Sequence, residues 1–135
     1  KNVLALSYGF CSERGLGQNA MGTTLTRILH ELSFLMERSG AERLTVLSLA
    51  GFGDILATCT SPLSRNFRAG QGLAQGKTRA QIEAEVRSTV EGLSTVSAVK
   101  EMAQNHGLTL PLIQQLWELC QGTSSPEAFT EQLLR

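Results

Sequence analysis

The sequence has no net charge, few aromatic residues, only three prolines and three cysteines, and no long apolar run. Twelve basic residues balance twelve acidic ones among 135, so the chain lacks the excess positive charge typical of nucleic-acid binding. No apolar run approaches the roughly 20 residues of a membrane span, and we expect none. The hydrophobic content of 41% excludes a disordered chain. Length and composition therefore predict one folded domain over residues 1–135.

The three cysteines, Cys11, Cys59 and Cys120, lie far apart and form no C-x-x-C pair. Their odd number and spacing favour small apolar core residues over a disulfide framework or a redox site. Histidines and carboxylates form no metal-binding pattern, so no metal site is expected. The cysteine usage and the lack of a recognisable secretory signal predict a cytoplasmic location.

Apolar residues recur at helical spacing along nearly the whole chain, whereas alternation with a period of two is not sustained. This spacing predicts long helices over residues 19–38, 90–106 and 111–120. A glycine suited to end a helix follows each of them: Gly40, Gly107 and Gly122.

Two further helices have clear starts. Thr78 and Gln81 form a capping box for a helix that ends near Val86, and Ser125 with Pro126 begins the last helix. The best strand candidate, residues 44–49, leads straight into a glycine-rich segment. We therefore predict an all-α fold of about eight helices with no sheet.

Polar side chains and glycines concentrate between residues 49 and 66. If Asp54 and Thr58 share a helix, their spacing puts the carboxylate and the hydroxyl on one face. Gly51 and Gly53 would allow another backbone or a ligand to approach closely. The alternative is that Asp54 only stabilises a helix N-terminus through the helix dipole.

Ser64, Arg65 and Asn66 precede a helix predicted to reach about Gln75. Free N–H groups at a helix start, next to a guanidinium, suit a phosphate. An ordinary solvated arginine after a turn is the alternative. Lys1 stands at the start of an apolar helix, and in a closed cleft its pKa could fall far enough for acid–base work. The alternative for Lys1 is a solvated chain end.

Six segments occur in an order that resembles the C-terminal substrate domain of bacterial-type NAD(P)-dependent glycerol-3-phosphate dehydrogenase. The resemblance covers essentially the whole chain and implies an all-helical domain like that of 6-phosphogluconate dehydrogenase-like enzymes. The segments that carry it are Lys1-Asn2-Val3, Gly15-Leu16-Gly17-Gln18-Asn19-Ala20, Leu49 to Asp54, Thr58 to Ser61, Ser64-Arg65-Asn66 and Val90-Glu91-Gly92.

The resemblance also implies roles for individual residues. Lys1 would be the catalytic acid–base that exchanges a proton with the C2 oxygen of the substrate. Substrate contacts are implied for Lys1, Asn2, Asp54, Thr58, Ser64, Arg65 and Asn66. Cofactor contacts are implied for Arg65, Thr89 and Glu91.

By this resemblance the reaction interconverts dihydroxyacetone phosphate and sn-glycerol 3-phosphate by hydride transfer with NAD or NADP. The dinucleotide-binding domain, which would hold most of the cofactor, is absent from the 135 residues, so we expect the chain alone to be inactive. Two alternatives stay open: a helical dimerisation or interaction domain, and the substrate domain of a related two-domain dehydrogenase. A homodimer is a further expectation.

Overall fold

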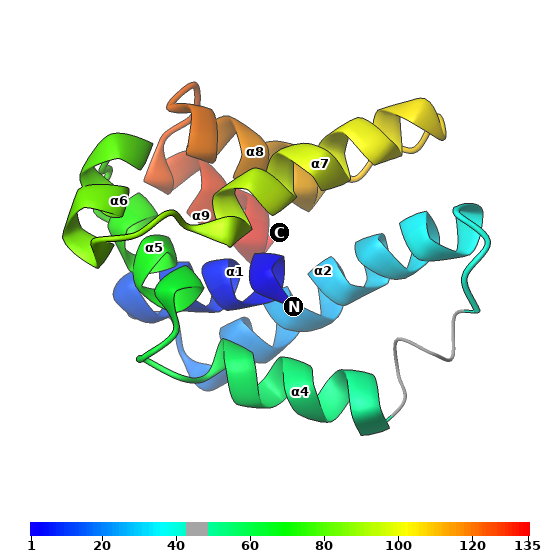
Figure 1. Ribbon diagram of the computed structural model, residues 1–135, viewed down its shortest axis with the longest axis horizontal. Coiled ribbons are helices and arrows are strands. Elements are labelled where there is room, and N and C mark those ends of the chain that lie inside the picture. The colour runs from blue at the N-terminus through cyan, green and yellow to red at the C-terminus, as the bar shows by residue number, and fades with distance from the viewer. Residues whose placement is uncertain (43–48) are drawn as a thin grey trace.

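The computed structural model describes residues 1–42 and 49–135, and side-chain burial is described outside residues 49–52. Over these ranges the chain forms helices joined by short connections, without a strand, as Figure 1 shows. The all-α prediction is confirmed, although the strand candidate lies, except for Leu49, outside the described residues. The helices are α1 (Asn2–Glu13), α2 (Gln18–Arg38), α4 (Leu49–Cys59), α5 (Arg65–Ala74), α6 (Arg79–Val86), α7 (Glu91–Asn105), α8 (Pro111–Gln121) and α9 (Pro126–Leu134).

The predicted helix ends agree with the structure. Thr78 and Gln81 form the capping box of α6, and the Ser125 hydroxyl accepts the N–H of Ala128 at 3.2 Å at the start of α9. The three glycines predicted to end helices all have left-handed backbones, with φ of 88° at Gly40, 64° at Gly107 and 74° at Gly122.

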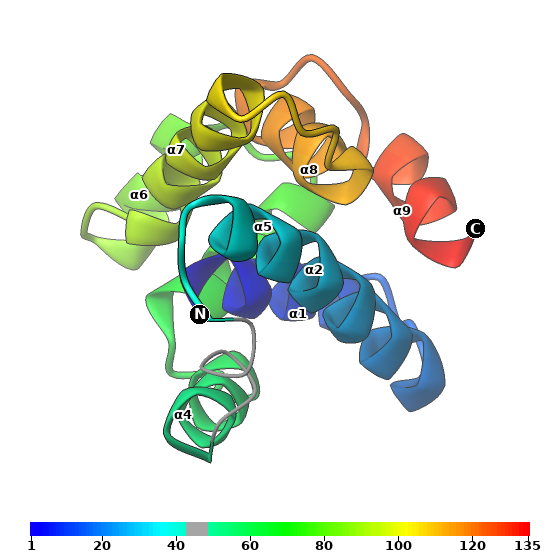
Figure 2. The same ribbon diagram turned by 90° about the vertical axis from the view of Figure 1, so that its right-hand side faces the viewer.

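Helix α1 lies at the centre of the molecule, against α2, α4, α5 and α7 (Figures 1 and 2). Its side chains Leu4, Leu6 and Phe10 are 1% exposed or less. The Phe10 ring meets Phe129 of α9 edge-on, with 4.9 Å between the ring centroids. Because α1 is apolar around its whole circumference, it is a core helix rather than an amphipathic surface helix.

The backbones of α1 and α5 touch where the two helices cross. A Cβ added at Gly70 would collide with the carbonyl oxygen of Leu6, and one added at Gly9 would collide with that of Phe67. Two glycines facing backbone in this way allow an interaxial distance that larger residues would forbid.

A half-buried carboxylate joins α2 to the C-terminal helices. Glu31 accepts the N–H groups of Leu112 at 2.9 Å and Ile113 at 3.1 Å, and so caps the start of α8 from a neighbouring helix. Burial raises the pKa of Glu31, although the two N–H donors act in the opposite direction. This contact fixes α8 on α2.

The cysteine prediction is confirmed for two of the three residues. Cys11 and Cys59 are fully buried, while Cys120 is half-buried, and all three are free thiols. Burial raises the pKa of Cys11 and of Cys59 to about 11, so both thiols are protonated at neutral pH. Among the described residues, no helix is long and apolar enough to cross a bilayer.

The α1–α5 crossing leads to a stability prediction. Gly70→Ala places a methyl group against backbone that cannot give way, so it should destabilise the fold by about 3 kcal/mol. The matched control is Gly22→Ala in α2, where an added Cβ meets nothing within 4 Å. That control should stabilise the helix by about 0.5–1 kcal/mol. Urea unfolding measures both, and equal effects of the two substitutions would contradict the close crossing.

Candidate active site

The first residues of α1, α5 and α7 meet on one face of the molecule. The amide Nδ2 of Asn2 donates to Oε2 of Glu91 at 3.4 Å, and the N–H of Gly92 donates to Oδ1 of Asn66 at 2.8 Å. Figures 1 and 2 both place the start of α1 between α4 and α7. Because each helix N-terminus carries a partial positive charge, this face favours an anion.

Lys1 and Asp54 form the charged pair of this face. The Lys1 Nζ lies 2.8 Å from Oδ2 of Asp54, with both side chains about half exposed. The hydrogen bond that Lys1 donates to Asp54, and then the charge of Asp54, raise the pKa of Lys1. Of the two alternatives for Lys1, the structure favours the solvated one over a lysine whose pKa falls in a closed cleft, because the amine is half exposed and faces a carboxylate. The Lys1 side chain is therefore a protonated ammonium group at neutral pH.

Helix α4 brings Asp54 to Lys1. Asp54 lies well inside α4, whose first turn contains no acidic residue, so the interpretation as a simple helix-dipole residue is wrong. Thr58 follows one turn later and is half-buried. The Cys59 thiol lies 3.9 Å from the carbonyl oxygen of Lys1 and ties the same helix to the start of α1. No described part of the chain approaches Gly53, because a Cβ there would meet nothing within 4 Å, so the space beside it stays open to a ligand. The side-chain surroundings of Gly51 lie outside the described residues.

The start of α5 is arranged as expected for an anion site. The Ser64 hydroxyl accepts the N–H of Phe67 at 3.4 Å, which leaves the hydroxyl proton available as a donor. Asn66 uses its side-chain oxygen for Gly92, so its NH₂ group remains available. In the described part of the chain, the N–H groups of Arg65 and Asn66 have no acceptor. All these groups are donors.

Arg65 is held in place rather than freely solvated. Its Nη1 donates to Oγ of Ser88 at 2.7 Å, in the connection between α6 and α7. Sequence reasoning missed Ser88, because a single serine between two helices carries no pattern that distinguishes it. Thr89, the next residue, is exposed and makes no hydrogen bond to the other predicted site residues that the structure describes.

Gly92 has a packing role of its own, although sequence reasoning named it only within the Val90-Glu91-Gly92 segment. A Cβ at this position would lie 2.6 Å from Oδ1 of Asn66 and 3.0 Å from Cδ1 of Leu6. Only glycine therefore allows the Asn66–Gly92 hydrogen bond at this helix spacing. A glycine in the first turn of a helix, directly after Glu91, was the available signal.

Comparison with known proteins identifies the family of the chain. The family model described as "NAD-dependent glycerol-3-phosphate dehydrogenase C-terminus" matches residues 1–131. The chain belongs to this family. A glycerol-3-phosphate dehydrogenase (NAD(P)+) of Synechococcus sp. (strain JA-3-3Ab) is 41% identical over 99% of the chain and 43% of the relative. That of Anaeromyxobacter dehalogenans (strain 2CP-C) is 39% identical over 100% of the chain and 41% of the relative.

Solved glycerol-3-phosphate dehydrogenase structures contain the same helical arrangement. The crystal structure from Coxiella burnetii superposes with a TM-score of 0.91 at 32% identity, over 99% of this chain and 41% of that one. The Plasmodium falciparum structure shares the fold, with a TM-score of 0.86 at 18% identity over 99% of this chain and 40% of that one. The chain thus spans about two-fifths of the length of these proteins, in their C-terminal part.

The Lys1–Asp54 pair makes a titration prediction. Asp54→Asn removes the two largest causes of the raised pKa of Lys1, so this pKa should fall. An NMR titration of the Lys1 side-chain carbons measures the change. The control is Glu85→Gln, which removes the carboxylate paired with Lys77 at 2.7 Å and should leave the Lys1 titration unchanged. A Lys1 pKa that is the same in Asp54→Asn and the parent chain would contradict the pairing.

Proposed function

We propose that residues 1–135 form one substrate domain of an NAD(P)-dependent glycerol-3-phosphate dehydrogenase, which interconverts dihydroxyacetone phosphate and sn-glycerol 3-phosphate. One observation carries the proposal: a protonated lysine, held by Asp54, lies on the same face as three helix N-termini and the donors around Arg65. A substrate with a phosphate at one end and a reducible carbonyl at its central carbon needs both features. This pairing favours the proposal over a dehydrogenase that acts on an unphosphorylated acid or sugar.

In this proposal the start of α5 binds the phosphate. The Ser64 hydroxyl, the Arg65 guanidinium and the Asn66 amide are donors, and the helix N-terminus adds its positive potential. Binding the phosphate at a distance from the reacting carbon orients the substrate, which lowers the barrier without any chemistry at the phosphate itself.

Lys1 is then the proton donor. Reduction of the carbonyl builds negative charge on the C2 oxygen, and the Lys1 ammonium stabilises that charge and delivers a proton. Asp54 positions the ammonium and keeps it protonated. Asn2 follows Lys1 directly in the sequence, and Thr58 follows Asp54 by one turn of α4. We assign both to the substrate hydroxyls.

The cofactor contacts of this chain are few. When bound, the nicotinamide cofactor supplies or accepts the hydride. The Arg65 guanidinium would bind the phosphates of the cofactor. The Glu91 carboxylate, which already accepts from Asn2, would accept a hydrogen bond from a hydroxyl or amide group of the cofactor. Thr89, two residues before Glu91, is exposed. Most of the cofactor would bind to a dinucleotide-binding domain, so the 135-residue chain alone should show no dehydrogenase turnover.

Titration with sn-glycerol 3-phosphate tests the proposal. The amide resonances of residues 64–67 should shift and saturate at millimolar ligand, and the Lys1 side chain should respond as well. Glycerol should shift neither, and inorganic phosphate should shift residues 64–67 with a smaller effect at Lys1. Arg65→Ala should remove most of the response, whereas Arg38→Ala, an exposed arginine at the end of α2, should not. The absence of any shift at residues 64–67 would contradict the proposal.

Self-association and a cytoplasmic location stay predictions. Three free thiols are consistent with a reducing compartment. Large apolar side chains at the surface provide contact area for a second copy or for another domain. These side chains include Phe34, Met36, Leu56, Leu63, Met102 and Leu134. Sedimentation equilibrium at several concentrations distinguishes a homodimer from a monomer.

A further inference from the structure

The first turn of α7 contacts one asparagine from α1 and one from α5. The N–H of Gly92 donates to Oδ1 of Asn66 at 2.8 Å, and Oε2 of Glu91 accepts from Nδ2 of Asn2 at 3.4 Å. Both asparagines are half-buried. Two adjacent residues of one helix therefore hold two side chains of the candidate active site that lie far apart in the sequence.

The chemistry of each partner decides which end of the asparagine amide it meets. A side-chain amide has an oxygen that only accepts and an NH₂ group that only donates. A backbone N–H only donates, so Gly92 meets the oxygen of Asn66 and leaves its NH₂ group without a partner among the described residues. An ionised carboxylate only accepts, so Glu91 meets the NH₂ group of Asn2, whose oxygen has no partner in the described part of the chain. The two amides therefore present opposite polarities.

Packing holds the Asn66 amide in this orientation. Oδ1 of Asn66 lies so near Gly92 that a Cβ on the glycine would be only 2.6 Å away. Leu6 of α1 closes the same space, with its Cδ1 3.0 Å from that Cβ position. If the amide were flipped, its NH₂ group would face the N–H of the buried Gly92, and two donors would meet. The NH₂ group of Asn66 therefore stays the free end.

Charge holds the Asn2 amide. Lys1 uses the carboxylate of Asp54 at 2.8 Å, which leaves Glu91 as the acceptor for Asn2. A flipped Asn2 amide would direct its oxygen at the Glu91 carboxylate, and two acceptors repel. The oxygen of Asn2 therefore stays the free end.

We propose that Glu91 and Gly92 are positioning residues, which orient the two asparagine amides so that the site selects a ligand with both a phosphate and a free hydroxyl group. The inference rests on the proposed function and deepens it. The free NH₂ group of Asn66 suits phosphate oxygens. The free oxygen of Asn2 needs a donor, which a terminal hydroxyl supplies and a methyl group does not. A site that pairs with a hydroxyl disfavours a ligand without one, because its acceptor is then left unpaired.

Phosphate binding to the 135-residue chain tests the role of Gly92. The side-chain NH₂ resonances of Asn66 should shift on addition of sn-glycerol 3-phosphate or of inorganic phosphate. Gly92→Ala displaces the Asn66 oxygen, so the affinity for both ligands should fall about tenfold and the NH₂ shift should be lost.

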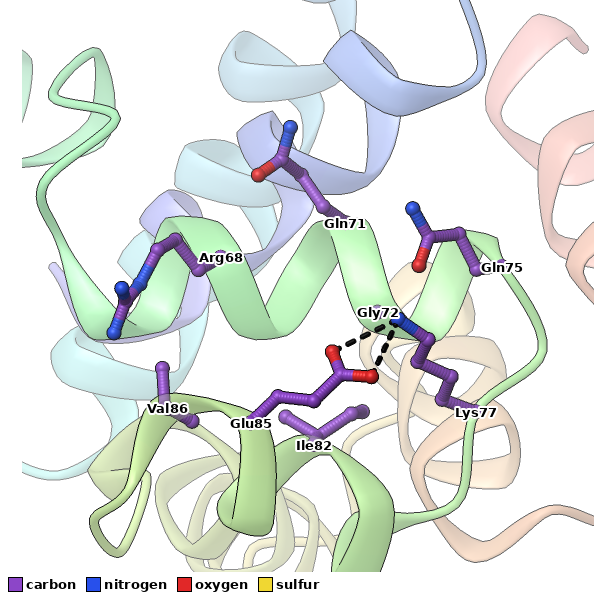
Figure 3. Close-up of a pocket in the computed structure, with 8 residues that line it drawn as sticks. All are labelled: Arg68, Gln71, Gly72, Gln75, Lys77, Ile82, Glu85 and Val86. Atoms are coloured by element: carbon purple, nitrogen blue, oxygen red, sulfur yellow. Dashed lines mark hydrogen bonds and ion pairs between the residues drawn. The ribbon is translucent and has the colours of Figure 1, made fainter.

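The matched control is Gly72→Ala on the same helix as Asn66. A Cβ at Gly72 would lie 2.7 Å from Cγ1 of Ile82. Figure 3 shows both residues at a cavity between α5 and α6. Gly72 is about 9 Å along the axis of α5 from Asn66, so this variant should lose stability through crowding but bind phosphate as the parent does.

Asn66→Asp gives a second test that does not crowd the fold. One oxygen of the new carboxylate can still accept from Gly92, so the melting temperature should stay close to that of the parent. The other oxygen replaces the NH₂ group and repels phosphate, so the affinity should fall by at least about tenfold. Parent-like affinity in Asn66→Asp, or in a folded Gly92→Ala chain, would overturn the proposal.

Propane-1,2-diol 1-phosphate tests the role of Glu91. With the matching configuration at C2, it differs from sn-glycerol 3-phosphate only by a methyl group in place of the terminal hydroxymethyl group, and the parent should bind it about tenfold more weakly. Asn2→Ala and Glu91→Ala should each remove this difference. Glu91→Gln, whose side-chain oxygen can still accept from Asn2, should retain most of it. Equal binding of the two ligands by the parent, or a difference that survives Glu91→Ala, would contradict the proposal.

The ligands also separate failure of this inference from failure of the proposed function. If sn-glycerol 3-phosphate binds the parent, Gly92→Ala and Glu91→Ala equally well, the proposed function stands and the inference fails. If inorganic phosphate binding depends on Gly92 but sn-glycerol 3-phosphate does not bind, the proposed function fails while the orientation of Asn66 by Gly92 stands. If neither ligand binds the parent, both fail.

Discussion

The direct contact between the backbones of α1 and α5 is the constraint on which the rest of the structure depends. Gly9 and Gly70 allow it, and each faces a carbonyl oxygen that no side chain could approach. At this separation Leu6 of α1 also reaches Gly92 of α7, next to Asn66 of α5. The same packing that buries α1 therefore joins the starts of α5 and α7, and a looser crossing would separate the donors of the candidate active site.

The electrostatics of the molecule are local. The charges of the chain sum to zero, yet the candidate active site gathers Lys1, Arg65 and three helix N-termini on one face. Asp54 is the one carboxylate hydrogen-bonded to Lys1, and it keeps the lysine protonated rather than neutral. Glu83 and Glu85 of α6 are occupied with Arg79 and Lys77, whereas Glu91 lies on this face, where it accepts from Asn2 and also raises the pKa of Lys1. Net charge alone says nothing of such an arrangement.

Local sequence patterns predicted the fold well because helices depend on local interactions. The capping box of α6 and the glycine ends of α2, α7 and α8 are each decided within a few residues, and all agree with the structure. The left-handed end of α6 at Arg87 was not predicted, since arginine gives no signal for that conformation. Residue type and spacing pointed to Lys1, Asp54 and Thr58 and to residues 64–66, and the resemblance to a family implied their roles and added Asn2, Thr89 and Glu91. Their hydrogen bonds came only from the structure.

The sequence by itself determined the helices, their ends and the identity of the polar residues, because these follow from spacing, capping and backbone preference. Only the tertiary structure decided which polar groups meet. Lys1 and Asp54 are 53 positions apart, and Asn66 and Gly92 are 26 apart. It also decided between the two alternatives for Lys1, because the direction of its pKa shift depends on solvent and on a carboxylate from another helix. Long-range packing fixes such contacts, and no local pattern encodes them.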